Sequence, residues 1–209
     1  MSPEGRGVAR RLGLKNATGV LYYHRALKNY ESLNLDDAIA DVSEAIFYSR
    51  TNADYYATRG LFFIEARHLA EAEVDLQYAI RLNRRQGLAY YGLGILRFQE
   101  GNFDAALEHF EAALKIPGAR RAEIYYYRAV THHLLDHPEQ AAEDMDKALQ
   151  LFAANDKRLK DARAWKREIE GKLPESARKA SRPAAKKPRG KKATGSEGGG
   201  VPAKLPPSR

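Results

Sequence analysis

Four tyrosines, Tyr22, Tyr56, Tyr90 and Tyr125, are separated by 34, 34 and 35 residues, and the other regular positions of residues 19–155 keep the same period. A period of this length is typical of arrays built from one small supersecondary unit. Such a unit cannot bury its apolar face alone, so neighbouring units stack on a shared core and leave one extended surface. We therefore expect function to lie on a surface rather than in a pocket.

Small residues recur twice in each unit when the units are counted from Gly19, Ala53, Gly87 and Ala122. Place 8 holds Ala26, Gly60, Gly94 and Ala129, place 20 holds Ala38, Ala72, Ala106 and Ala141, and place 24 holds the larger Val42, Leu76, Phe110 and Met145. Small residues that face one another let two helix axes approach to about 8 Å, and large residues fill the space beside them. The sequence therefore predicts one helical hairpin per unit, with turns near residues 32–36, 66–69, 100–103 and 135–138.

With Ala45, Ala79, Ala113 and Ala148 at place 27, the pattern resembles the tetratricopeptide repeat (TPR) family. That family has an aromatic residue at place 4, Gly or Ala at 8, Ala at 20 and 27, and an apolar or aromatic residue at 24. The resemblance covers about two thirds of the chain and implies an all-α, right-handed α-solenoid. Its four units would be residues 19–52, 53–86, 87–121 and 122–155. The family's frequent proline at place 32 is missing here, which bears on the angle between repeats and not on the fold.

Charged residues follow the same register. Place 7 holds Arg25, Arg59 and Arg128, and place 23 holds Asp41, Asp75 and Asp144, whereas the third unit has Leu93 and His109 at these places. The two places lie at nearly the same height on opposite helices of one hairpin. Because the Arg at place 7 and the Asp at place 23 are present together or absent together, we predict a structural ion pair inside the first, second and fourth units.

Residues 156–173 are predicted to form a capping helix. Asn155 or Asp156 can cap its start, and Leu159, Ala162, Trp165 and Ile169 would form one apolar stripe. Trp165 is then a core residue rather than a ligand platform. A repeat array needs such a terminal element with a polar outer face.

The TPR resemblance implies that the first helix of each hairpin lines a concave groove. At the corresponding places this chain has the following predicted groove residues: Tyr23, Leu27, Tyr30, Ala57, Leu61, Ile64, Tyr91, Ile95, Phe98, Tyr126, Tyr127 and Val130. An exposed apolar and aromatic stripe usually marks an interface, here one for a protein or peptide segment. Packing of part of this stripe against the N-terminal segment or neighbouring helices is the alternative.

One subset of the family grips the carboxylate end of chaperones with Lys and Asn at places 5 and 9 of one unit and Asn at place 6 of the next. Here the first two units hold Tyr23, Leu27 and Thr58 at these places, and the next pair holds Ala57, Leu61 and Gly92. The clamp residues are therefore absent. An apolar or amphipathic partner segment is favoured instead.

The chain is basic at its C-terminal end. Residues 174–209 contain 10 Lys and Arg against 2 acidic residues, many Pro and Gly, and no aromatic residue, which predicts a disordered tail. Its predicted polyanion contacts are Arg178, Lys179, Arg182, Lys186, Lys187, Arg189, Lys191 and Lys192. Cations on a flexible segment bind nucleic acid by counterion release, without sequence selectivity when no aromatic residue can stack on a base.

Three other readings of the tail stay open. The tail could be solubilising only, or it could be a nuclear-import signal in a eukaryote. It could also fold back onto the acids beside the groove and compete with the partner; those acids are Glu31, Asp54, Glu65 and Glu123.

Nothing in the sequence argues for catalysis, a cofactor or a metal. His132, His133 and His137 invite a metal site, but His133 and His137 straddle a predicted turn and no third facing ligand completes the set. The chain has no cysteine, which suits a reducing compartment, and no apolar run long enough to span a bilayer. Residues 1–18 form a basic flexible leader without the apolar stretch of a secretory signal. We expect a cytoplasmic location without membrane insertion.

These observations favour a non-enzymatic adaptor or scaffold that binds a protein segment in the groove. The alternative is a factor associated with nucleic acid or the ribosome through the tail. A self-assembling homo-oligomer is a third class, and it would show a concentration-dependent mass.

Overall fold

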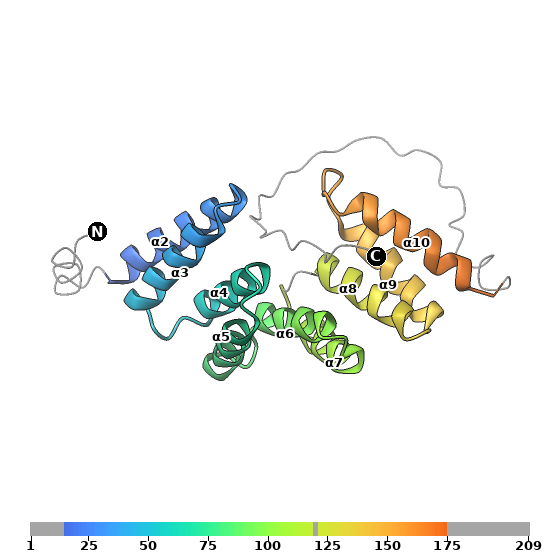
Figure 1. The fold of residues 1–209 in the computed structure, drawn as a ribbon, viewed down its shortest axis with the longest axis horizontal. Helices are drawn as coiled ribbons and strands as arrows, with labels where there is room; N and C mark the ends of the chain where they lie inside the picture. The colour runs from blue at the N-terminus through green and yellow to red at the C-terminus, as the bar shows by residue number, and fades with distance from the viewer. Residues whose placement is uncertain (1–14, 119–120, 175–209) are drawn as a thin grey trace. The chain divides into compact units, whose positions relative to one another are not determined.

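The computed structural model describes residues 15–118 and 121–174, and within these ranges it contains nine α-helices and no strand (Figure 1). The all-helical prediction is confirmed for this part of the chain. Residues 1–14 of the predicted leader and residues 175–209 of the predicted tail lie outside it. Residues 15–18, predicted as part of the flexible leader, instead belong to the first helix. The helices fall into two compact units, which are described separately.

The first unit holds three helical hairpins. Their helices are α2 (Lys15–Glu31) with α3 (Leu35–Tyr48), α4 (Ala53–Glu65) with α5 (Leu69–Leu82), and α6 (Gly87–Gln99) with α7 (Phe103–Leu114). Helix α4 packs against α3, and α6 packs against both α4 and α5. Each hairpin therefore stacks on the one before it within this unit.

The second unit holds a fourth hairpin and a further helix. The hairpin consists of α8 (Arg121–Leu134) and α9 (Pro138–Leu151), and α10 (Leu159–Lys172) packs mainly against α9 and also touches α8. Helix α10 begins later than the sequence predicts, with Arg158 at its N-cap. Asp156 instead accepts hydrogen bonds from the backbone N–H and the guanidinium of Arg158, because residues 156–158 form a turn before the helix.

All four hairpin turns share one backbone conformation at place 15. Leu33, Arg67, Gly101 and Asp136 have φ values of 64°, 64°, 77° and 58°. In each turn the next residue donates its N–H to a carbonyl five residues back, as in the Asn102-to-Arg97 bond of 2.9 Å, which is the Schellman arrangement that satisfies helix-end carbonyls. Only the third hairpin uses glycine, so the other three accept a left-handed residue that costs roughly 1–2 kcal/mol.

The core of each hairpin depends on a match between places 8 and 24. A Cβ atom added at Gly60 would lie 2.7 Å from the Leu76 side chain, and one added at Gly94 would lie 2.4 Å from the Phe110 ring. The first and fourth hairpins have Ala at place 8 and Val42 or Met145 at place 24. Glycine is therefore required where the facing residue is the bulky Leu or Phe.

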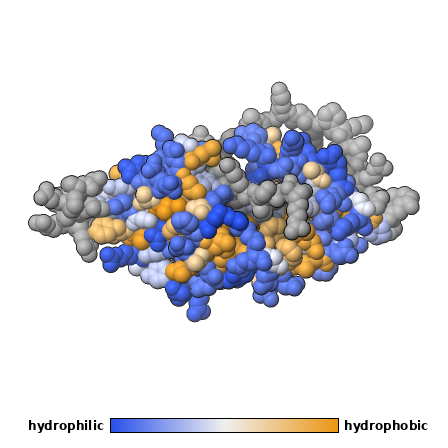
Figure 2. Space-filling view, viewed as in Figure 1, coloured by the Kyte–Doolittle hydropathy of each residue, from blue (hydrophilic) through white to orange (hydrophobic). Residues whose placement is uncertain are grey.

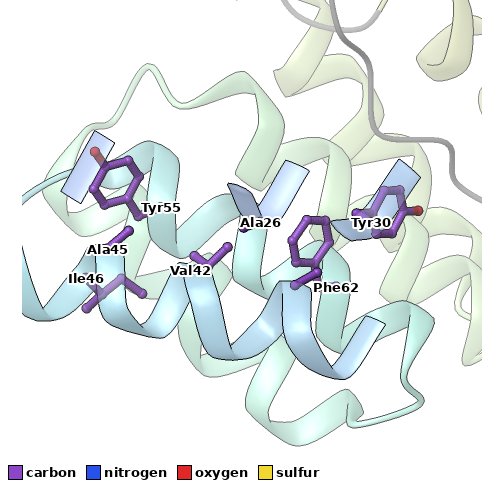
Figure 3. Packing of buried hydrophobic residues seen from close by; sticks show 8 residues of the cluster. Ala26, Tyr30, Val42, Ala45, Ile46, Tyr55 and Phe62 are labelled. Carbon is purple, nitrogen blue, oxygen red and sulfur yellow. The ribbon is translucent and has the colours of Figure 1, made fainter. Parts of the chain in front are cut away.

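Figure 3 shows this packing in the first hairpin and its neighbour. The buried cluster joins all three helices α2, α3 and α4. Its labelled members are Ala26, Tyr30, Val42, Ala45, Ile46, Tyr55 and Phe62. Burial of apolar area across two consecutive hairpins is what holds them in contact.

Candidate protein-interaction surface

The predicted groove residues are less exposed than the sequence suggests. Tyr23, Leu27 and Phe98 are half-buried. The other nine are buried: Tyr30, Ala57, Leu61, Ile64, Tyr91, Ile95, Tyr126, Tyr127 and Val130. The expected fully exposed stripe is therefore corrected to a few accessible side chains beside a buried apolar layer.

Contacts between consecutive hairpins explain part of this burial. The Tyr23 ring lies 4.9 Å from the Tyr55 ring, and its hydroxyl is 3.0 Å from Thr58 Oγ1. Two helical turns further along α2, the Tyr30 ring stacks on Phe62 at 4.6 Å, and its hydroxyl donates to Glu65 Oε1 at 3.3 Å. The tyrosines of α2 are thus packing residues between the first and second hairpins.

The third hairpin buries its predicted residues in a similar way. The Tyr91 ring lies 6.4 Å from the Phe110 ring, and a Cβ at the neighbouring Gly92 would lie 2.6 Å from Leu76 of the preceding hairpin. Phe98 stays half-buried against Phe103 at 5.7 Å. Close approach of α6 to α5 buries Tyr91 and its neighbours. Among the predicted groove residues of the third hairpin, Phe98 is therefore the accessible aromatic residue.

In the second unit, the predicted groove residues pack into the fourth hairpin and its surroundings. The Tyr126 ring lies 5.4 Å from Tyr127 and 6.1 Å from Phe152. Burial raises the pKa of the Tyr126 hydroxyl well above its ordinary value. Trp165 of α10 is half-buried and meets His133 edge-on at 5.5 Å, so it packs against the fourth hairpin. His133 Nε2 also lies 3.2 Å from Glu168 Oε1 of α10.

The first unit carries acidic residues on its first helices α2 and α4. Glu31 and Asp54 are exposed, and Glu65 is half-buried. Asp54 Oδ1 accepts a 2.7 Å hydrogen bond from Gln86 Nε2 of the next repeat. The sequence analysis placed these acids beside the groove but missed the hydrogen bonds between consecutive repeats. The sequence signal for such a hydrogen bond was that its donor and acceptor residues are about one repeat period apart.

The structure brings together each Arg and Asp pair that the repeat register indicated. Arg59 Nε and Nη2 donate to the two oxygens of Asp75 at 2.6 and 2.9 Å, and Arg128 makes the same two bonds to Asp144 at 2.6 and 2.8 Å. Arg25 binds Asp41 in the same two-pronged way, through Nε at 2.6 Å and through Nη2. In the third hairpin, which lacks the pair, Arg97 contacts Glu73 and Glu100 instead.

A hollow of about 500 Å³ is lined by side chains of α2 and α3 in the first hairpin, among them Arg25 at place 7. In the second hairpin the residue at place 7, Arg59, faces the preceding hairpin and bonds Ser43, so the hollow lies on the side of the first hairpin away from the second. We call this side the N-terminal end face. Its lining residues are Tyr22, Arg25, Asn29, Asp37, Ala40, Asp41 and Glu44. Sequence reasoning missed it because it treats all four repeats as equivalent, whereas the first hairpin has no preceding hairpin among the described residues.

Apolar residues also reach the surface elsewhere. In the view of Figure 2 they form patches separated by hydrophilic residues. The exposed large apolar side chains of the described ranges include Leu21, Leu33 and Val74.

The predicted polyanion contacts between Arg178 and Lys192 lie outside the described residues, as does the basic leader up to residue 14. Among residues 15–118 and 121–174, no cluster of three or more His, Asp or Glu is arranged to hold a metal ion. No helix in these ranges is both long enough and apolar enough to cross a membrane.

Comparison with known proteins identifies the repeats. The family model described as tetratricopeptide repeat matches residues 87–116, which correspond to the third hairpin. A relative named tetratricopeptide repeat protein 6, from Homo sapiens, is 31% identical over 114 residues, or 54% of this chain. The chain belongs to the tetratricopeptide repeat family. Its all-α solenoid of TPR hairpins is the architecture of that family.

One further relative and one solved structure are similar to the repeats of this chain. Serine/threonine-protein phosphatase 5 of Rattus norvegicus is 29% identical over 98 residues. The solved first TPR domain of Spaghetti (RPAP3), bound to an HSP90 peptide, has a TM-score of 0.52 at 20% identity and covers 58% of this chain and 95% of that domain. This chain spans 22% of the length of tetratricopeptide repeat protein 6 and 20% of the phosphatase, so it matches these relatives in a part only.

Proposed function

We propose that this TPR protein is a non-enzymatic adaptor that binds a segment of a partner protein along the first helices of its hairpins. Membership of the family supports an interaction role, and the similar first TPR domain of Spaghetti (RPAP3) is bound to an HSP90 peptide. The observation that carries the proposal is the position of Leu27 and Phe98. Both are half-buried apolar side chains on first helices, whereas other predicted groove residues, such as Leu61 and Tyr91, are fully covered.

Such a surface suits a short apolar segment. Half-buried apolar side chains lose little conformational entropy on binding and still remove area from water when a partner covers them. Tyr23, about one helical turn before Leu27 on α2, adds a large aromatic surface. Affinity would come from a few such anchors rather than from the whole set of predicted groove residues.

Charge narrows the chemistry of the partner. Glu31 lies on α2, and Asp54 and Glu65 lie on α4, so an acidic tail bound along these first helices would meet like charges. At the places where a carboxylate clamp needs Lys and Asn, the first two hairpins have Tyr23, Leu27 and Thr58, and Thr58 is buried against Tyr23. We therefore propose an apolar partner segment that carries Lys or Arg, rather than a chaperone-type acidic terminus.

A second candidate function rests on the tail. Its 10 Lys and Arg against 2 acids would bind nucleic acid or a ribosome through phosphates. Such binding falls steeply with salt and is lost after nuclease treatment. Binding at the apolar surface should survive both.

The test captures proteins from lysate on the full chain, with and without nuclease, and reads them by mass spectrometry. Leu27→Asp and Phe98→Asp should abolish capture of a nuclease-resistant partner, because each places a charge inside the apolar contact. Val74→Asp is the matched control, since Val74 is an exposed apolar residue on a second helix. Replacement of the eight predicted tail contacts by Gln should leave that capture intact. Loss of all capture in the Gln variant, with Leu27→Asp and Phe98→Asp behaving as the parent, would replace the adaptor with the polyanion-binding candidate.

A further inference from the structure

The N-terminal end face of the first hairpin corresponds to the face of the second hairpin that packs against the first. In the second hairpin, Tyr55, Arg59 and Phe62 occupy places 3, 7 and 10. They are covered by the first hairpin: Tyr23 lies against Tyr55, Ser43 accepts a 3.1 Å hydrogen bond from Arg59 Nη1, and Tyr30 stacks on Phe62. These places therefore form the contact with the preceding hairpin.

The same places in the first hairpin hold Leu21, Arg25 and Lys28. Leu21 is 70% exposed, whereas its counterparts Tyr55 and Ala89 are buried. The Arg25 side chain is 60% exposed, against 21% for Arg59. Leu21 and the Arg25 side chain of the ion pair are thus exposed to solvent on the end face, whereas their counterparts in the second hairpin are packed.

The chemistry of the end face is acidic on its α3 side. Asp37, Asp41 and Glu44 line the hollow together with one guanidinium, that of Arg25, and Asp36 is exposed next to them. Three carboxylates against one Arg give the lining a formal charge of −2. A basic segment with a few apolar side chains is the complement of this surface.

Residues 1–14 have that composition. They contain Arg6, Arg10 and Arg11 against the single acid Glu4, and their larger apolar residues are Val8, Leu12 and Leu14. They join α2 directly at Lys15.

Reach and tethering also favour these residues. Fourteen residues can extend about 46 Å, whereas Asn29, the far edge of the hollow on α2, lies only about 21 Å along the helix from its start. A short tether gives the segment an effective concentration in the millimolar range, which a separate partner rarely reaches.

We propose that residues 1–14 dock on the N-terminal end face and act as the N-terminal cap of the array. Leu12 and Val8 cover Leu21 and the Tyr22 ring, and the arginines lie against the carboxylates of α3. This interaction uses the side of the first hairpin opposite to the second, so it is separate from the proposed partner surface on the first helices.

Disulfide trapping tests the proposal cleanly because the chain has no cysteine of its own. Val8→Cys, which is seven residues before Lys15 and can extend about 23 Å, is combined with Ala40→Cys, which lies in the hollow, or with Val74→Cys, the residue at the same place in the second hairpin. In dilute full-length chain, the pair with Ala40→Cys should close an intramolecular disulfide at least about tenfold faster than the pair with Val74→Cys. Equal rates would overturn the proposal.

Two further outcomes separate the other occupants. A disulfide that forms only between chains would show that a second copy covers the face and would also overturn the proposal. Arg10→Glu with Arg11→Glu should slow the intramolecular reaction several-fold, and adding Asp37→Lys with Glu44→Lys should restore it. Failure of the charge swap to change the rate would contradict the proposed charge pairing.

Discussion

The first and second hairpins carry the same Arg and Asp ion pair in different surroundings. Arg59 and Asp75 lie against the first hairpin, where Ser43 adds a further hydrogen bond to the guanidinium. Arg25 and Asp41 lie on the end face, where Asn29 donates to Asp41 at 3.0 Å but the Arg side chain remains largely exposed. The comparison teaches that position in a repeat array, and not residue identity alone, decides what an interaction contributes.

The C-terminal end of the described chain shows how an array is closed. Helix α10 packs on α9 and follows the repeat period, since Arg158 reaches Glu123 and Glu168 reaches His133, both 35 residues apart. In this 35-residue register, the small-residue place 8 after Ala129 holds Ala164. Ala164 is exposed, because no second helix follows α10 among the described residues. The N-terminal end has no closing helix like α10 among the described residues.

The largest difference between the two hairpins should appear at place 10. Phe62→Ala removes a buried ring that stacks on Tyr30, and it should lower the free energy of unfolding by about 3–5 kcal/mol. Lys28→Ala, at the same place on the end face, should change it by less than about 0.5 kcal/mol. Urea unfolding followed by far-UV circular dichroism measures both. Similar losses for the two variants would break the comparison.

The ion pairs should show a difference of intermediate size. Asp75→Ala leaves the Arg59 guanidinium without its carboxylate in a partly buried site, and we expect a loss of about 1–3 kcal/mol. Asp41→Ala should cost at most about 1 kcal/mol, because the exposed Arg25 can turn to water. Thermal melts of the two variants and the parent would check this. An unchanged melt for Asp75→Ala would contradict the structural role of the pair.

The smallest expected effect concerns place 23 of the third hairpin, where His109 replaces Asp. Burial lowers the pKa of His109 below its ordinary value of 6.5, and repulsion by Arg97 lowers it further, against opposing effects of Glu108 and Glu73. The folded chain then binds fewer protons than the unfolded chain. The stability that neutral His109 contributes is therefore present above pH 6.5 and is lost as the pH falls through the folded-state pKa.

This dependence is measurable with one variant. In His109→Gln, the free energy of unfolding should fall less steeply between about pH 7 and about pH 5 than in the parent chain. His24→Gln is the control, because His24 is exposed on α2. If the free energy of unfolding changed with pH identically in the parent and in His109→Gln, His109 would not contribute to the pH dependence of stability.

Much of the fold followed from the sequence because its register is strict. The small residues at places 8 and 20, such as Gly60 and Ala72, located the hairpin cores, and joint presence of Arg59 and Asp75 pointed to their contact. The left-handed turn residues were not predicted, because Leu33 and Arg67 are not the glycines that normally mark this conformation.

The candidate site was less predictable than the fold. A family pattern says which places face the concave side, but it does not say how closely consecutive first helices approach. Here Tyr30 stacks on Phe62 and its hydroxyl reaches Glu65, so a residue expected to contact a partner is used for packing. Leu27 and Phe98 are half-buried and remain accessible, and the sequence pattern does not distinguish them from Tyr30.

The most direct test of the adaptor proposal is site-specific photocrosslinking in lysate from three positions. A photoreactive residue is placed at Leu27, at Phe98 or, as the control, at Val74 on a second helix, and nuclease is present throughout. The account predicts that Leu27 and Phe98 crosslink to the same protein and that Val74 does not. Crosslinks from Val74 alone, or none from Leu27 and Phe98 while nuclease-sensitive material binds the tail, would contradict it.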